Sequence, residues 1–145
     1  MSIPAAISLV TLGVRDVAAA TSFYEALGFP LSSASVPGEV SFFRTAGGLL
    51  GLYGAGALAT DAQVAGSPDP GFRGVSLAIN VDSRDAVDSA MESAVAAGAT
   101  VLKPAQETDW GGYHAYFADP DGHAWEVAHN PYWPLDDRGL PQLPK

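Results

Sequence analysis

The feature of this sequence that most constrains the fold is an internal repeat. A β-rich run over residues 7–14 is followed by a helical pattern that ends at Gly28. The same succession recurs, with a β-rich run over 75–81 and a helical pattern that ends at Gly98. The two glycines lie about 70 positions apart. Self-similarity at a fixed period is typical of duplicated structural units.

Strand signals follow each helical pattern. They predict the order β-α-β-β-β in both copies, and hence an α+β fold in a single domain, 1–145, with units at about 5–54 and 74–131. A polar segment with Gly and Pro, 55–74, is predicted to link the units, and a proline-rich tail, 131–145, to run extended. The predicted strands lie at 40–45, 49–53, 101–102, 112–118 and 124–129.

Composition limits the class of protein. The chain has 145 residues, of which 48% are hydrophobic and 16% charged, and this is typical of a globular domain. The formal net charge of −9 disfavours nucleic acid as a partner, and every apolar run is too short to span a membrane. The absence of cysteine excludes disulfides and thiolate metal sites. Because the N-terminus lacks the layout of a signal peptide, we expect a cytoplasmic protein.

The last predicted hairpin, 113–129, gathers polar side chains on one face. Side chains alternate between the faces of a strand, so His114 and Tyr116 point the same way, and the five-residue loop 119–123 brings Glu126 to that face. The other face carries large apolar side chains and is predicted to pack under helices. A carboxylate, an imidazole and a phenol among alanines are typical of a pocket, but the alternation fits a sheet face turned to water equally well.

Two motifs make a resemblance to a known family specific. The first is Leu12-Gly13-Val14-Arg15-Asp16 with Ser22-Phe23-Tyr24 and Leu27-Gly28-Phe29, and the second is Asp119-Pro120-Asp121-Gly122-His123 with Trp125-Glu126-Val127. Over about residues 7–131 the chain resembles the vicinal oxygen chelate superfamily, which includes glyoxalase, bleomycin-resistance and fosfomycin-resistance proteins and extradiol dioxygenases. The resemblance implies two units side by side, a U-shaped curled mixed sheet around a central cavity with the helices outside, and a homodimer.

The resemblance also assigns metal-ligand positions to the first and last strands of each unit. Glu126 matches the last-strand position of the second unit, but Leu9 and Ser76 occupy the first-strand positions, and Leu50 or Leu52 the remaining one. Leucine cannot coordinate a metal, and Glu126 with one imidazole is too small a ligand set for Zn, Fe or Mn. We therefore predict a protein without a bound divalent metal and without another cofactor.

Further residues are expected to surround the same cavity and bind a ligand. Trp110 precedes two glycines near the hairpin, and it either forms a lid that stacks on a flat ligand or closes the core. The expected lining consists of Leu9, Thr11, Leu50 or Leu52, Ser76 and Asn80.

Two classes of function remain. The first is a metal-free protein that binds an aromatic or cationic small molecule and sequesters it as bleomycin-resistance proteins do. The missing metal ligands and the net negative charge favour this class. The alternative is a glyoxalase-like lyase or isomerase, or a dioxygenase-related enzyme, that uses Glu126 with or without a metal. In such an enzyme Glu126 would be the general base and His114 or Tyr116 the acid.

Overall fold

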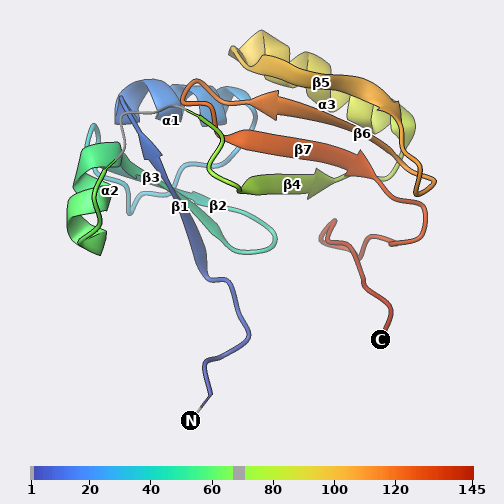
Figure 1. The fold of residues 1–145 in the computed structure, drawn as a ribbon, viewed down its shortest axis with the longest axis horizontal. Helices are drawn as coiled ribbons and strands as arrows, with labels where there is room; N and C mark the ends of the chain where they lie inside the picture. The colour runs from blue at the N-terminus through green and yellow to red at the C-terminus, as the bar shows by residue number, and fades with distance from the viewer. Residues whose placement is uncertain (1, 67–70) are drawn as a thin grey trace. The chain divides into compact units, whose positions relative to one another are not determined.

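A computed structural model describes residues 2–66 and 71–145 (Figure 1). The chain divides into two compact units, Met1–Ser67 and Pro68–Lys145, hereafter unit 1 and unit 2. Each unit is an α+β structure with its own sheet and its own apolar core. Within the described part of the chain, no helix has the length and apolar content needed to cross a membrane.

Unit 1 contains a three-stranded sheet and two helices. Its strands lie in the order β1-β3-β2, with β1 parallel and β2 antiparallel to β3. The elements are β1 (Leu9–Val14), α1 (Val17–Ala26), β2 (Val40–Arg44), β3 (Leu49–Gly54) and α2 (Ala55–Ala62).

Helix α1 forms where the sequence provides both a start and a stop. The Asp16 carboxylate accepts a hydrogen bond from the backbone N–H of Ala19, and Gly28, just past the end, has φ of +98°. The helix buries a stripe at helical spacing, in which the Tyr24 ring packs 6.0 Å from the Phe43 ring of β2. This packing holds the helix on one face of the sheet.

Two predictions for unit 1 need correction. The second strand of the β-α-β-β-β order is reduced to a single bridge between Leu31 and Phe43. The segment 55–74, predicted to be a linker, begins with helix α2, because its alanines and Leu58 favour helix despite the glycine at position 56. Residues 67–70 of that predicted linker lie outside the described residues.

Unit 2 has the complete predicted order. Its sheet has the strand order β4-β7-β6-β5, in which β4 is parallel to β7 and the other pairs are antiparallel. The elements are β4 (Ser76–Asn80), α3 (Arg84–Ala97), β5 (Thr100–Glu107), β6 (Tyr113–Ala118) and β7 (Ala124–His129).

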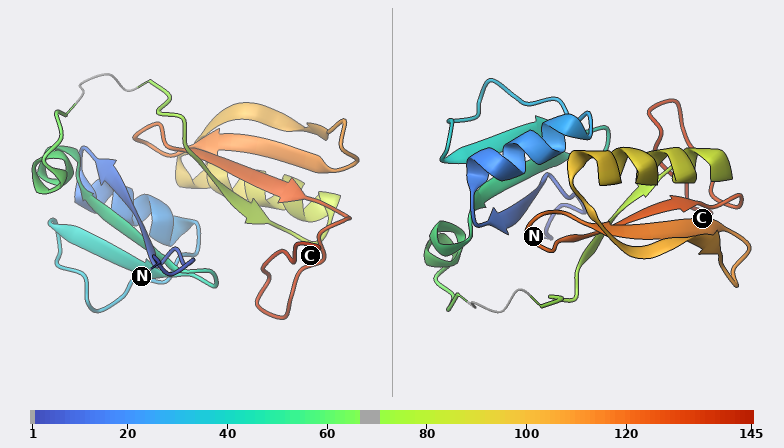
Figure 2. Two further views of the ribbon diagram at one scale, coloured as in Figure 1. Left: turned by 60° about the horizontal axis from the view of Figure 1, so that its bottom comes forward. Right: turned by 90° about the horizontal axis from the view of Figure 1, so that it is seen from above.

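Helix α3 covers one face of this sheet (Figure 2). It starts at Ser83, whose hydroxyl accepts from the backbone N–H of Ala86, and ends at Gly98, where φ is +108°. The predicted apolar face of the hairpin is confirmed, because its inward side chains are buried and the rings of Phe117 and Trp125 stack 6.2 Å apart. The buried residues on the two sides are Val87, Met91 and Ala94 of α3 and Ala115, Phe117, Trp125 and Val127 of the sheet.

Candidate functional site

The sheet face of unit 2 opposite α3 carries the predicted polar residues. Across the hairpin Tyr116 is paired with Glu126, and His114 lies on the same face two residues before Tyr116. The parallel neighbour of Glu126 in β4 is Ala78. We call this surface the Glu126 face and define it by Lys103, His114, Tyr116 and Glu126.

His114 and Glu126 form the shortest polar contact of this face. The imidazole Nδ1 lies 2.6 Å from Glu126 Oε2, and the two side chains are 11% and 20% exposed. Tyr116 lies directly across the hairpin from Glu126, and its ring lies 5.4 Å from the imidazole at a steep angle. The prediction that these three side chains share one face is therefore confirmed.

The surroundings of Tyr116 fix the state of its phenol. Burial raises its pKa above the ordinary value of 10.0, and the negative charge of the neighbouring Glu126 raises it further. Tyr116 therefore remains a protonated hydrogen-bond donor at neutral pH.

Lys103 is a member of the face that the sequence analysis missed. Its Nζ lies 3.0 Å from Nε2 of His114, so both ring nitrogens of the imidazole are engaged. The predicted strand stopped at residue 102, whereas β5 continues to Glu107. Strands tolerate proline at sheet edges and at bulges. Pro104 is therefore the one signal in the sequence that indicates an irregular edge strand here.

Trp110 lies beside the same imidazole. Its ring is 5.9 Å from that of His114 in an edge-on arrangement, and the residue is 42% exposed. A Cβ on Gly112 would be 1.9 Å from Trp110 Cζ3, so glycine at this position is what lets the indole fold back onto the strand. Of the two predicted roles, lid or core, the exposure argues against a purely core role.

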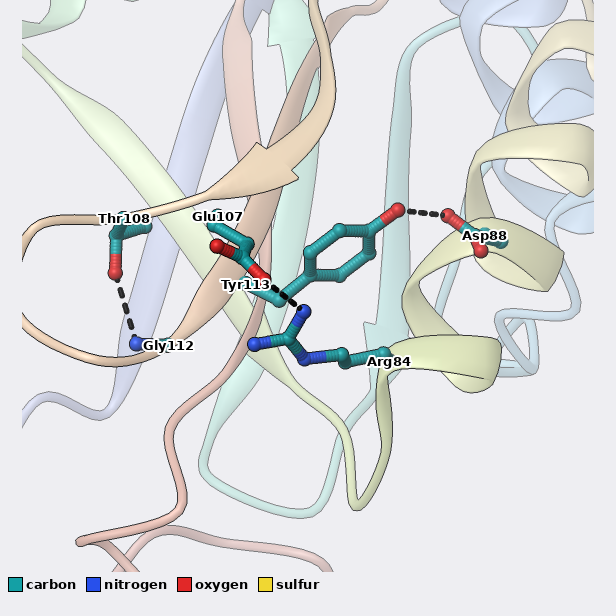
Figure 3. Close-up of polar contacts among 6 residues, drawn as sticks. All are labelled: Arg84, Asp88, Glu107, Thr108, Gly112 and Tyr113. Atoms are coloured by element: carbon teal, nitrogen blue, oxygen red, sulfur yellow. Dashed lines mark hydrogen bonds and ion pairs between the residues drawn. The ribbon is translucent and has the colours of Figure 1, made fainter.

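Hydrogen bonds and ion pairs secure the strands on both sides of Trp110 (Figure 3). Thr108 Oγ1 accepts from the N–H of Gly112 across the loop, at 2.9 Å. Tyr113 donates to Asp88 of α3 at 2.7 Å, which raises the pKa of its phenol. Arg84 of α3 pairs with Glu107 at 2.8 Å and lies over the Tyr113 ring. The loop that carries Trp110 is thus held at both ends.

Ser76 and Asn80 lie on β4 with the parity of the Glu126 face. Ser76 is the neighbour of Ala124, and Asn80 that of Ala128, on either side of the Ala78–Glu126 pair. Neither residue has a hydrogen bond to Glu126 described in this structure. Their role in binding stays a prediction.

In unit 1, Leu9 and Thr11 lie beside Gly51, whose Cβ position would be 3.3 Å from Leu9 and 3.2 Å from Thr11. Leu50 and Leu52 are placed differently from the prediction. They pair with Val10 and Leu12 of β1 and are 3% and 0% exposed. Because side chains alternate, these two leucines belong to the core under α1 and not to the face of Leu9 and Thr11.

Matching registers explain this correction. Thr11 is the neighbour of Gly51 in unit 1, as Ala78 is of Glu126 in unit 2. Gly51 is therefore the counterpart of Glu126, and the two leucines are counterparts of the core residues Trp125 and Val127.

The side chains of these faces do not fit a divalent metal. Ala78, the strand neighbour of Glu126, and the corresponding pair in unit 1, Thr11 and Gly51, supply neither imidazole nor carboxylate. The Lys103 ammonium lies against the Nε2 lone pair that a metal would need. Among residues 2–66 and 71–145, no group of three His, Asp or Glu side chains could hold a metal ion.

Unit 1 also has a pocket of about 560 Å³ that the sequence analysis did not predict. It lies where β1 and β3 end and α1 and α2 begin. Its charged groups are of both signs and single out no class of ligand. The lining residues are Arg15, Asp16, Val17, Gly38, Glu39, Tyr53, Gly54 and Ala57.

The profile of the Glyoxalase/Bleomycin resistance protein/Dioxygenase superfamily matches residues 6–127. No curated protein gives a significant match.

Several solved structures resemble this chain along almost its whole length. A glyoxalase-related enzyme from Fulvimarina pelagi is 36% identical with a TM-score of 0.85, and the match covers 96% of this chain and 98% of that one. A glyoxalase/bleomycin resistance protein/dioxygenase from Nocardioides is 29% identical with a TM-score of 0.74, over 99% and 92% of the two chains. The lactoylglutathione lyase from Agrobacterium tumefaciens is 24% identical with a TM-score of 0.69, over 92% and 100%, and supports the fold alone.

Proposed function

The chain belongs to the Glyoxalase/Bleomycin resistance protein/Dioxygenase superfamily, and from that premise we propose that it binds a small aromatic or cationic molecule at the Glu126 face without a metal. In this proposal the protein sequesters its ligand, as the name of bleomycin-resistance relatives implies, and does not transform it. The Glu126 carboxylate is the anchor for the ligand, and the Trp110 indole is the aromatic surface next to it.

The state of Glu126 is the observation that carries this proposal. Its side chain is 20% exposed and accepts a hydrogen bond from His114 at 2.6 Å, and Tyr116 lies directly across the hairpin from it. A carboxylate has about four lone-pair sites, so the bond from His114 leaves room for a ligand. A carboxylate that carries negative charge and accepts hydrogen bonds suits a cationic or hydrogen-donating ligand.

The same contacts favour binding over acid–base catalysis. General acid–base catalysis would require an acid beside Glu126, and His114 and Tyr116 are the candidates. His114 has both nitrogens engaged, and the pKa of Tyr116 is raised, which makes its phenol a poor acid near neutral pH. These residues form a rigid hydrogen-bonded group, which is what recognition of a ligand requires.

Binding of three matched indole compounds tests the proposal. Tryptamine carries an ammonium, tryptophol a hydroxyl and indole-3-propionate a carboxylate on similar side chains. By isothermal titration calorimetry we expect tryptamine to bind at least about tenfold more tightly than the anion. Equal binding of the three compounds, or none, would contradict the proposed ligand class.

Glu126→Gln is the variant that isolates the anchor. The amide keeps the shape of the side chain and an acceptor oxygen for His114, but removes the charge. We expect it to lose about tenfold or more in tryptamine affinity while its melting temperature changes little. Glu92→Gln, on the exposed side of α3, is the matched control and should bind like the wild type.

Absence of a metal is part of the same proposal. Elemental analysis of untagged protein is expected to give far less than one Zn, Fe, Mn or Ni per chain. A value near one would overturn this part, whatever the indole compounds do.

A glyoxalase-like lyase or isomerase, or a dioxygenase-related enzyme, is the second candidate. The observation in its favour is the Tyr116 donor directly beside the Glu126 carboxylate, which brings a proton donor and an acceptor together. Turnover of hemithioacetals by the wild type, abolished in Glu126→Gln, would establish this class in place of the binder. A cytoplasmic location, with neither nucleic acid nor membrane as partner, accords with both candidates and stays a prediction.

A further inference from the structure

His114 is held between a cation and an anion. Lys103 Nζ lies 3.0 Å from its Nε2, and Glu126 Oε2 lies 2.6 Å from its Nδ1. An ammonium group can only donate, so Nε2 accepts, and the ring proton is then on Nδ1, where it donates to the carboxylate. The order Lys103, His114, Glu126 therefore fixes one tautomer of the imidazole.

An irregularity of β5 brings Lys103 to this position. Thr100 and Val101 pair with Ala118 and Phe117, so a regular strand would place Leu102 opposite Tyr116. The register instead shifts, Lys103 takes that place, and a second shift follows before Gln106. Extra residues of this kind re-aim side chains and are frequent beside functional sites. Leu102, the displaced residue, is 54% exposed.

We propose that Lys103 is a positioning residue, which orients His114 by its hydrogen bond to Nε2 and through His114 holds Glu126 for the ligand. Its consequence for ligand binding rests on the proposed function, whereas the orientation of His114 does not. Lys103 itself need not touch the ligand.

The charge of Lys103 lets the direction of the change in tryptamine affinity separate a positioning role from a purely electrostatic one. A positive charge next to the binding site repels a cationic ligand, so its removal by Lys103→Met would, by charge alone, raise tryptamine affinity. A positioning role has the opposite effect, because His114 and Glu126 lose their fixed arrangement. We expect Lys103→Met to lower tryptamine affinity at least about fivefold, and Lys103→Arg to stay within about twofold of the wild type.

Nitrogen-15 NMR of the ligand-free protein tests the orientation independently of any ligand. The two ring nitrogens of His114, assigned by their loss in His114→Gln, should show a proton on Nδ1 and an unprotonated, hydrogen-bonded Nε2 in the wild type. In Lys103→Met the Nε2 resonance should shift by several parts per million, and Lys103→Arg should restore it. Arg138→Met, which removes an exposed cation from the tail, is the control and should change neither resonance.

The outcomes separate the two proposals. If Lys103→Met leaves the Nε2 resonance unchanged, or raises tryptamine affinity, Lys103 is not a positioning residue. If the wild type binds no tryptamine but Nε2 shifts as expected, the positioning role stands and the proposed function fails.

Discussion

Tyr116 illustrates how neighbours set the state of one side chain. Burial and the negative charge of Glu126 both disfavour its ionised form, so its pKa lies above 10.0 in the folded protein. A group whose pKa is raised on folding stabilises the protein fully below its unfolded pKa. That contribution is lost as the pH rises through the folded pKa.

We therefore expect Tyr116→Phe to flatten the alkaline end of the stability profile. In the wild type the free energy of unfolding should fall above about pH 10. Because phenylalanine does not ionise, the variant should lose less stability over the same interval. Urea unfolding at several pH values measures the difference, with Tyr132→Phe, at an exposed position, as the control. Parallel profiles for wild type and Tyr116→Phe would contradict the assignment.

Three residues of the Glu126 face could be predicted from the sequence, and the fourth, Lys103, could not. Alternation along two short strands was enough to group His114, Tyr116 and Glu126. It could not include Lys103, because a register shift breaks alternation and leaves no periodic trace in the sequence.

At the scale of elements, the parity of β3 decides which leucines are structural. Leu50 or Leu52 was predicted at the cavity, but the residue whose register matches that of Glu126 is Gly51, one position from each. A slip of one position exchanges the two faces of a strand.

The bounds of β7, by contrast, agree with the prediction, since the turn over 119–123 fixes the hairpin. Helix α2 was not predicted because its small residues and the single large apolar residue Leu58 form no apolar stripe at helical spacing.

Leu52→Ala should act as a core truncation. The side chain is 0% exposed, so we expect a loss of about 2–5 kcal/mol in the free energy of unfolding. Leu9→Ala, at a position that is 41% exposed, should lose much less. Denaturant unfolding gives both values. Equal losses would mean that the assignment of faces in the unit 1 sheet is wrong.

The loop between β5 and β6 depends on glycine at position 112. A methyl group there would overlap the Trp110 ring and lie 2.7 Å from the His129 carbonyl oxygen. We expect Gly112→Ala to displace the indole and to destabilise the protein by about 1–3 kcal/mol. A change in tryptophan fluorescence would accompany the loss. Gly56→Ala is the matched control, since its Cβ would meet nothing within 4 Å in α2 and alanine favours helix.

At the scale of the whole molecule, we expect a homodimer. The family resemblance motivates this expectation, as do two aromatic residues of the tail, Tyr132 and Trp133, which are 71% and 39% exposed. Light scattering at micromolar concentration should give twice the mass of one chain. The double variant Tyr132→Ser with Trp133→Ser should shift the mass towards the monomer. A monomer mass for the wild type would rule the dimer out.

The pairing of first strand with last strand in each unit has a consequence for biosynthesis. Among the described residues, β1 pairs with β3 alone and β4 pairs with β7 alone, so neither sheet is complete until the last strand of its unit has been made. A strand that waits for a distant partner forms its sheet late. Once Gly54 has left the ribosome, every strand of unit 1 is available, and unit 1 can assemble while unit 2 is still being translated. Slowly translated synonymous codons after position 54 should therefore favour productive folding. Pauses between Asn80 and Ala124, by contrast, would leave the β4 edge unpaired on the nascent chain.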